Sequence, residues 1–262
     1  MRKCFFATSV ALLAALMSGC VRQSEIKTDL FEKNETVMLS EGRTDSLNMK
    51  ISLEYATGGV SAEVVDSINR LISMTAFGPD YDSLDVKEAS AAYISEKAKD
   101  YKESNLELLA WMKENNDEGP TATMNWYENV SGFFYGRHGD VTSYVVKDEA
   151  YQGGAHGMAS DQGVNFITIT GEMISESEFL VPDYKEKLSQ LLTAHLQEAM
   201  PDTSAYNALF IKDIEPNGNF RVSGNGLTYV YGQYEIGPYY LGIIYVTVPW
   251  EEAEQLLAAR NQ

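Results

Sequence analysis

A strict alternation of apolar and polar residues at positions 46–55 constrains the fold more than any other feature of the sequence. The apolar members of this alternation are Leu47, Met49, Ile51, Leu53 and Tyr55. Because successive side chains of a β-strand point to opposite faces, the pattern predicts a strand with one buried face and one solvated face. We therefore expect a sheet that is covered on one side, as is common in antiparallel sheets.

Other segments between turn-forming residues also have the composition of strands. The turn at residues 135–140 predicts a hairpin, and His138 is expected in solvent at its tip. A glycine-dense bend follows at residues 152–157. The predicted strands are, by residue number, 36–39, 47–55, 121–134, 141–151, 164–170, 227–231 and 243–248.

Four helices are expected between these strands. Ser61 is placed to cap the first, a long second helix covers residues 86–115, and Asp183 with Glu186 predicts a capping box for the third. The last helix begins at Pro249. Because helices and strands interleave without regular alternation, we predict an α+β fold of two tightly packed subdomains with antiparallel sheets.

The first twenty residues have the composition of an export signal. Two basic residues precede an uncharged, mostly apolar run at residues 5–17, which ends at Ser18-Gly19-Cys20. A membrane-spanning helix needs about 20 residues, so this shorter run predicts a signal peptide. The small residues before Cys20 resemble a lipobox and predict that the mature chain begins at Cys20 and carries lipid on its sulfur. An ordinary secretory signal cleaved near Gly19 is the alternative.

Cysteine content and charge narrow the function classes. Cys4 lies in the expected signal peptide and Cys20 is expected to be acylated, so no thiol is left for a disulfide, a zinc–thiolate site or nucleophilic catalysis. The formal net charge of −18 argues against nucleic acid or an anionic membrane surface as a partner and favours a basic one. We expect contact with the membrane through the lipid anchor alone.

Searches for catalytic motifs give no clear candidate. The sequence has no Gly-x-Ser-x-Gly elbow, phosphate-binding loop or His-Glu-x-x-His metal motif. We therefore expect no cofactor, no metal and no identifiable catalytic residue. His195 falls on the apolar stripe of its helix and is expected in the core. His156 lies among small residues, with Asp161 nearby, and is expected to lock the tight bend; an acid–base or metal role is the alternative.

Tyrosines are concentrated near the C-terminus. Seven aromatic residues lie between Tyr229 and Trp250, and the loop at residues 232–241 is the part that packing explains least. Tyrosines suit protein interfaces and sugar stacking because each has a rigid face and a polar tip. The predicted ligand-binding residues are Tyr234, Glu235, Tyr239 and Tyr240.

Two segments together resemble a known bacterial envelope module. The first is Gln152-Gly153-Gly154-Ala155-His156-Gly157, in which Gly153, Gly154 and His156 form the structural motif. The second is Tyr234-Glu235-Ile236-Gly237-Pro238-Tyr239. They are similar to the extracytoplasmic module of RsiV-type anti-sigma factors, in which a PdaC-type N-terminal domain precedes a C-terminal domain of unknown function.

The resemblance implies a domain organisation and a class of function. It divides the chain into a signal peptide (1–19), a lipidated tether (20–27), a PdaC-type domain (28–160) and an RsiV-type domain (161–262). In RsiV-type proteins the module receives lysozyme, a very basic protein. We therefore expect a non-catalytic, periplasmic or outer-membrane lipoprotein that binds a lysozyme-like protein or cell-wall glycan. The alternative is a hydrolase or deacetylase of envelope polysaccharide that uses Glu235 or His156 as the acid–base group.

Overall fold

The structure is a computed structural model that describes residues 25–117 and 121–259. Its first sheet is built from long strands of the N-terminal part of the chain. The sheet has the order β1-β2-β3-β4-β5, and only the β2–β3 pair is parallel. Its strands are β1 (Lys27–Met38), β2 (Ser46–Gly58), β3 (Trp126–His138), β4 (Val141–Tyr151) and β5 (Met158–Ile167).

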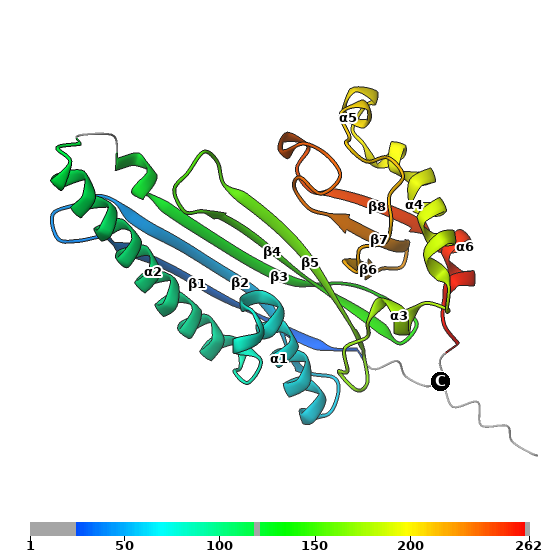
Figure 1. The fold of residues 1–262 in the computed structure, drawn as a ribbon. Coiled ribbons are helices and arrows are strands. Elements are labelled where there is room, and N and C mark those ends of the chain that lie inside the picture. The colour runs from blue at the N-terminus through cyan, green and yellow to red at the C-terminus, as the bar shows by residue number, and fades with distance from the viewer. Residues whose placement is uncertain (1–24, 118–120, 260–262) are drawn as a thin grey trace, which may run out of the picture.

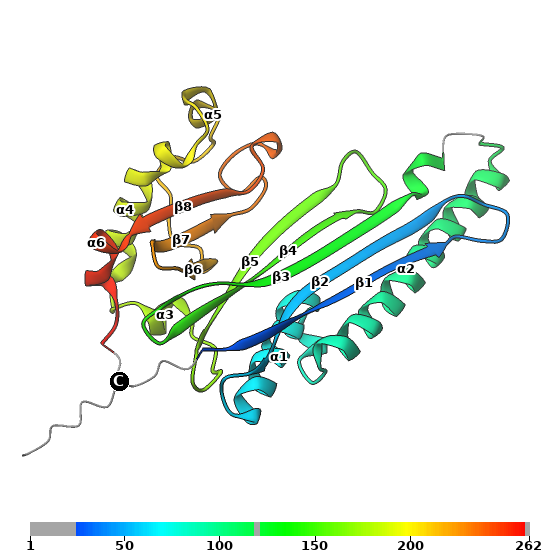
Figure 2. The same ribbon diagram turned by 180° about the vertical axis from the view of Figure 1, so that it is seen from behind.

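The parallel pair explains where the first two helices lie. A parallel connection must cross over the sheet, and here the crossover consists of α1 (Ala62–Phe77) and α2 (Val86–Glu114). Both helices cover one face of the sheet, which is the front face in Figure 1 and the rear face in Figure 2. The side chain of Ser61 accepts a hydrogen bond from Val64 N, which confirms the predicted cap of α1. Gly78 ends that helix.

The long helix α2 packs one face against the first core and exposes the other. Tyr93 and Tyr101 are buried, whereas Leu108 is exposed. Leu106 and Trp111 are exposed on the same stretch. Leu109 and Met112 pack against the first core, so the C-terminal half of α2 has one buried face and one exposed face.

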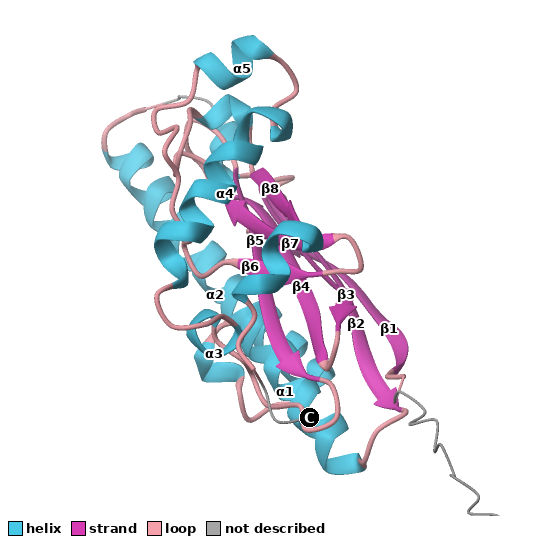
Figure 3. Cartoon of the chain, turned by 90° about the vertical axis from the view of Figure 1, so that its right-hand side faces the viewer, coloured by secondary structure: helices cyan, strands magenta, loops and turns pink. Residues whose placement is uncertain are grey.

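The second body contains a small antiparallel sheet in the order β6-β7-β8. Its strands are β6 (Phe220–Val222), β7 (Gly226–Tyr231) and β8 (Ile244–Pro249), and α4 (Tyr184–Ala199) packs against β8. Figure 3 shows α4 beside β8, and Figure 1 shows the short α6 next to α4. The short helices are α3 (Glu176–Phe179), α5 (Thr203–Asn207) and α6 (Trp250–Ala253).

Each body has its own core, and the two are joined side by side. Leu53 and Ile72 are buried in the first core, and Leu188 and Val246 in the second. The seam runs between β5 and β6, where the Asn165 side-chain amide donates to the carbonyl oxygen of Phe220 over 2.9 Å. The α+β fold with mainly antiparallel sheets is confirmed.

The chain passes from one body to the other later than the expected domain boundary. All of β5 pairs with β4, up to Ile167 opposite Val141. The boundary expected between residues 160 and 161 therefore falls inside a strand of the first sheet. The crossing itself lies at residues 168–175, after which α3 joins the second core through Phe179.

Local details of three elements differ from the prediction. Asp183 does precede α4, but its side chain caps nothing and its backbone has a left-handed φ of 64°. The capping box belongs instead to α3, where Ser175 and Glu178 bond reciprocally. Residues 121–124 form a 3-10 turn, so β3 begins and ends later than expected. Among the described helices, none is long and apolar enough to cross a membrane.

Candidate recognition surface

The glycine-rich bend at residues 152–157 and the tyrosine-rich loop at residues 232–241 meet in space. The His156 ring stacks on Tyr239, with ring centroids 4.0 Å apart. The Tyr234 hydroxyl lies 3.3 Å from His156 Nε2. The Tyr239 hydroxyl donates to the carbonyl oxygen of Gly157 over 2.7 Å. The two motifs that carry the sequence resemblance thus form one surface, contributed by both bodies.

The loop at residues 232–241 is held in shape by its own polar groups. Glu235 accepts from Gly232 N over 2.6 Å and from the Asn217 side-chain amide over 2.7 Å. Tyr234 has a left-handed φ of 66°, which costs energy in a residue with a bulky side chain. Ile236 anchors the loop because its side chain is buried. Glu235 therefore fixes the loop conformation that presents Tyr234.

The bend at residues 152–157 depends on its two central glycines. Gly153 and Gly154 have φ values of 75° and 136°, which favour glycine. A β-carbon on Gly153 would also lie 2.7 Å from the carbonyl oxygen of Thr123. His156 Nδ1 lies 3.0 Å from the carbonyl oxygen of the next residue, so the ring does contact the bend itself.

Large apolar side chains are exposed around these two loops. Tyr240 is 73% exposed, Phe210 64% and Tyr234 52%. Phe210 and Ile211 belong to the same surface because their backbone N–H groups donate to the carbonyl oxygen of Ile236 over 2.9 and 3.3 Å. Figure 1 shows the β4–β5 hairpin tip and the β7–β8 loop at the upper edge of the molecule. Tyr127 and Met158 are exposed next to Gly157 of the bend. We call this surface the recognition rim and define it as Tyr127, His156, Met158, Phe210, Ile211, Tyr234, Tyr239 and Tyr240.

The predicted site residues have different environments. Tyr234 and Tyr240 are exposed, whereas Tyr239 is half-buried and its hydroxyl is bonded to the bend. Glu235 is exposed, but one carboxylate oxygen accepts from Gly232 of its own loop and the other from Asn217. Cys20 lies outside the described residues.

The other two histidines connect elements. His138 was expected in solvent, which is wrong: its ring stacks on Trp250 of the second body with centroids 3.6 Å apart. His195 is partly buried on α4, and its Nε2 lies 3.1 Å from Glu252 Oε1 in α6. Neither histidine lies on the recognition rim.

A buried polar cluster beneath the bend was not predicted. Glu128 is almost fully buried, and its carboxylate accepts from the Tyr93 hydroxyl and from the Gln152 side-chain amide over 3.2 Å. Lys97 Nζ lies 3.3 Å from the same carboxylate. Burial and the Glu128 carboxylate raise the pKa of Asp148 to about 6. Through Gln152 this cluster supports the recognition rim.

A buried ion pair joins the two sheets. Asp161 was considered as a partner of His156, but its carboxylate lies 3.1 Å from Arg221 Nη1 and accepts from the Tyr245 hydroxyl over 2.8 Å. The Arg221 guanidinium also lies over the Tyr135 ring, 4.4 Å from its centroid. Asp161 therefore has a structural role in the seam.

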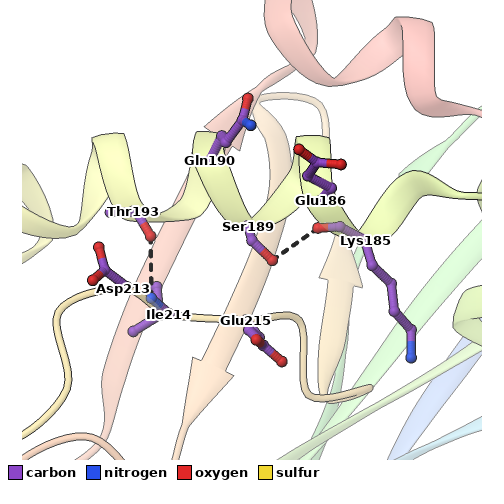
Figure 4. A pocket seen from close by; sticks show the side chains of 8 residues that line it. All are labelled: Lys185, Glu186, Ser189, Gln190, Thr193, Asp213, Ile214 and Glu215. Carbon is purple, nitrogen blue, oxygen red and sulfur yellow. Dashed lines mark hydrogen bonds between the residues drawn. The ribbon is translucent and has the colours of Figure 1, made fainter.

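An open groove of about 660 Å³ follows the outer face of α4 (Figure 4). Its walls are α4 and residues 213–215, which are tied together because Ile214 N donates to Thr193 Oγ1 over 3.1 Å. None of the predicted site residues lines it. In the described part of the chain, no group of three or more His, Cys, Asp or Glu side chains is arranged to hold a metal ion.

One family model matches the second body. Residues 177–251 match the model of DUF3298, a family described as a protein of unknown function. This segment starts within α3 and ends in the first turn of α6, so it spans the small sheet and α4. No curated protein matches the chain.

Two solved structures share the fold over most of the chain. A DUF3298 family member from Bacteroides fragilis NCTC 9343 has a TM-score of 0.79 and 24% identity, over 90% of this chain and 95% of its own. A DUF3298 family protein from Pseudomonas aeruginosa PAO1 has a TM-score of 0.61 and 12% identity, over 89% and 95%. The chain therefore contains a DUF3298 domain and has the fold of DUF3298 family proteins.

Proposed function

We propose that this protein is a non-catalytic binding module of the bacterial envelope that recognises its partner through the recognition rim. One observation supports the proposal most strongly. Two loops that are distant in sequence contact each other and form a single surface with exposed tyrosine rings. Exposed apolar surface rimmed by polar groups marks interaction sites, and tyrosine is enriched in interface hot spots.

The partner that fits best is a basic protein of the lysozyme kind, as the RsiV-type resemblance implies. The chain has a formal net charge of −18, which attracts a cationic protein from a distance. Exposed faces of Tyr234 and Tyr240 can receive Lys or Arg side chains, a contact worth about 0.5–2 kcal/mol. Association with a basic partner should slow with added salt, because charges are screened over about 8 Å at physiological ionic strength.

Cell-wall glycan is the other ligand within this proposal. The same two rings are suited to stacking against sugar rings, which does not require charge. The two ligands are distinguished by salt, because stacking on a neutral glycan depends on it far less than capture of a basic protein.

The proposed setting is a lipid anchor in the envelope. It depends on the N-terminal signal and on Cys20, which precede the described residues. Cys20→Ala should move the protein from the membrane fraction to the soluble fraction. Retention of the variant in the membrane fraction would show that another element anchors the chain.

The binding test uses substitutions that leave the loops intact. Tyr234→Asn suits the left-handed backbone at this position, and Tyr240→Ser removes the most exposed ring. Leu106→Ser with Trp111→Ser is the matched control, because it removes two exposed apolar side chains from α2. We expect the rim variant to lose roughly tenfold or more in affinity for lysozyme or for soluble peptidoglycan fragments. Equal binding by the rim variant and the wild type would refute the assignment.

A hydrolase is the second candidate, and one observation favours it. Asp148 lines a cavity of about 450 Å³ between α1, α2 and the sheet, and its pKa is raised to about 6 by burial and the adjacent Glu128 carboxylate. A carboxylic acid with a raised pKa in a cleft is typical of a general acid. Release of acetate or reducing sugar from peptidoglycan by wild type, but not by Asp148→Asn, would favour the enzyme over the binding module.

A further inference from the structure

A cavity of about 570 Å³ lies between the two bodies, apart from the recognition rim. Its walls come from β5, the crossing segment with α3, the start of α4, and β6. The volume lies within the range of about 300–1,000 Å³ found for small-molecule pockets, which occur preferentially at domain interfaces. The question is which ligand chemistry these walls would select.

One wall presents a carboxylate in a fixed position. Glu176 Oε1 accepts a hydrogen bond from the hydroxyl of Tyr229, a side chain with no exposed surface. Burial and the Glu176 carboxylate raise the pKa of Tyr184 to about 12 and raise that of Tyr229 further. Both phenols therefore stay protonated at neutral pH, and the Tyr229 hydroxyl fixes the position of the Glu176 side chain. A β-carbon on Gly218, across the cavity, would lie 3.9 Å from its other oxygen, Oε2.

The same cavity has one cationic side chain, Lys185. Within residues 25–117 and 121–259, its ammonium group makes no ion pair. Figure 4 shows that this side chain extends away from Gln190 and Asp213, which line the groove along α4. Lys185 lines both the groove and this cavity, and its ammonium group is available to an anionic group in the cavity.

The remaining polar side chains of the cavity are already engaged. Asn165 donates to the carbonyl oxygen of Phe220 and accepts from Ser143. Ser175 bonds Glu178 over 2.6 Å, and Ser177 lies 3.2 Å from Ser175 Oγ. A polyhydroxylated ligand would therefore find few neutral partners. The side chains left for a ligand are one anion, one cation and an apolar lining that includes Val164 and Met173.

We propose that this cavity binds a small zwitterion of the amino-acid or short-peptide class. The ligand's ammonium group pairs with Glu176, its carboxylate pairs with Lys185, and its body lies against the apolar lining. A ligand with only one of the two charges leaves the other wall group without a partner.

Three matched probes test this charge requirement on the full chain. Glycylglycine has both charges at neutral pH, N-acetylglycylglycine lacks the ammonium group, and glycylglycinamide lacks the carboxylate. Each is titrated while the backbone amide signals of Gly163, Ser177 and Gly218 are followed by two-dimensional NMR. We expect saturable shifts with glycylglycine in the millimolar range and binding roughly tenfold weaker with either single-charge probe.

Variants of the protein distinguish binding in the cavity from nonspecific binding to the protein surface. Glu176→Gln keeps an acceptor for Tyr229, and Lys185→Met removes an exposed ammonium group at little risk to folding. Each should weaken glycylglycine binding roughly tenfold. Lys187→Met, an exposed lysine of α4 outside the cavity, should leave it unchanged. Equal shifts with all three probes, no saturation, or unchanged binding by Lys185→Met would overturn the proposal. None of these results depends on whether the recognition rim binds its partner.

Discussion

Replacing Asp161 by asparagine should destabilise the fold more than any surface charge change. The Asp161 carboxylate has no exposed surface and the side chain of Arg221 is 5% exposed, so their ion pair lies out of water between the two sheets. Asparagine keeps the size of the side chain and an acceptor for the Tyr245 hydroxyl. The substitution therefore removes the charge and leaves the guanidinium of Arg221 buried without a counter-ion.

The expected loss is about 3 kcal/mol of unfolding free energy. Breaking a buried ion pair costs about 3–5 kcal/mol, because the remaining charge stays desolvated. The lower end applies here, since the Arg221 guanidinium still lies 4.4 Å from the centroid of Tyr135 and 4.9 Å from that of Tyr245. Lys147, with 44% of its side chain exposed, can turn to solvent.

Urea unfolding followed by circular dichroism measures this loss. The exposed pair of Lys33 and Glu35 is the control, and Glu35→Gln should change stability by less than about 0.5 kcal/mol. The double variant Asp161→Leu with Arg221→Met should be more stable than Asp161→Asn alone, because it leaves no unpaired buried charge. Stability of Asp161→Asn within about 0.5 kcal/mol of wild type would refute the reasoning.

Three further predictions concern single side chains. Burial and a neighbouring carboxylate raise the pKa of Asp148 from 3.8 to about 6, so the folded chain binds that proton more tightly. The free energy of unfolding should therefore fall as pH rises from 3.8 through about 6. Asp148→Asn should remove this fall and raise the melting temperature at neutral pH. An unchanged pH profile of the variant would contradict the prediction. Ser175→Ala should cost about 1 kcal/mol by removing the capping box, whereas Asp183→Gly, at a left-handed φ of 64°, should not destabilise the protein in urea unfolding. Leu188→Ala should cost about 2–5 kcal/mol in the second core, and the exposed Leu108→Ala less than about 0.5 kcal/mol; similar losses would mean that the cores are misplaced.

Features encoded by neighbouring residues could be predicted from the sequence. The alternation in residues 46–55 gave β2, and the Ser61 cap and the glycine at position 78 bounded α1. Each of these depends on contacts within a few residues, so the sequence pattern contains the cause. The long helix α2 was found for the same reason.

Features that depend on distant contacts were missed. The parallel pairing of β2 with β3 is decided by the crossover of two helices, which no local pattern of residues 126–138 reveals. The three-residue strand β6 exists because it pairs with β7 and packs against β5. The capping box was assigned to Asp183 because the spacing of acidic residues there mimics the true box at Ser175.

The two halves of the recognition rim were each identified from sequence, but their contact was not. The stacking of His156 on Tyr239 requires the β4–β5 hairpin to reach the second body, which depends on strand length and the seam. The burial of Glu128 could have been predicted from the sequence. In the alternating pattern of β3, Glu128 lies on the same inward face as the buried Val130. A charged residue at such a position predicts a buried polar cluster.

Hydrogen-exchange mass spectrometry of the full chain, with and without lysozyme or soluble peptidoglycan fragments, tests the central claim most directly. The recognition rim predicts slower exchange of backbone amides in residues 152–158, 208–211 and 232–241 when the partner is bound. The C-terminal half of α2, which lies outside the recognition rim, should exchange at the same rate in both states. Protection confined to α2, or no protection of the three rim segments with either partner, would contradict the account.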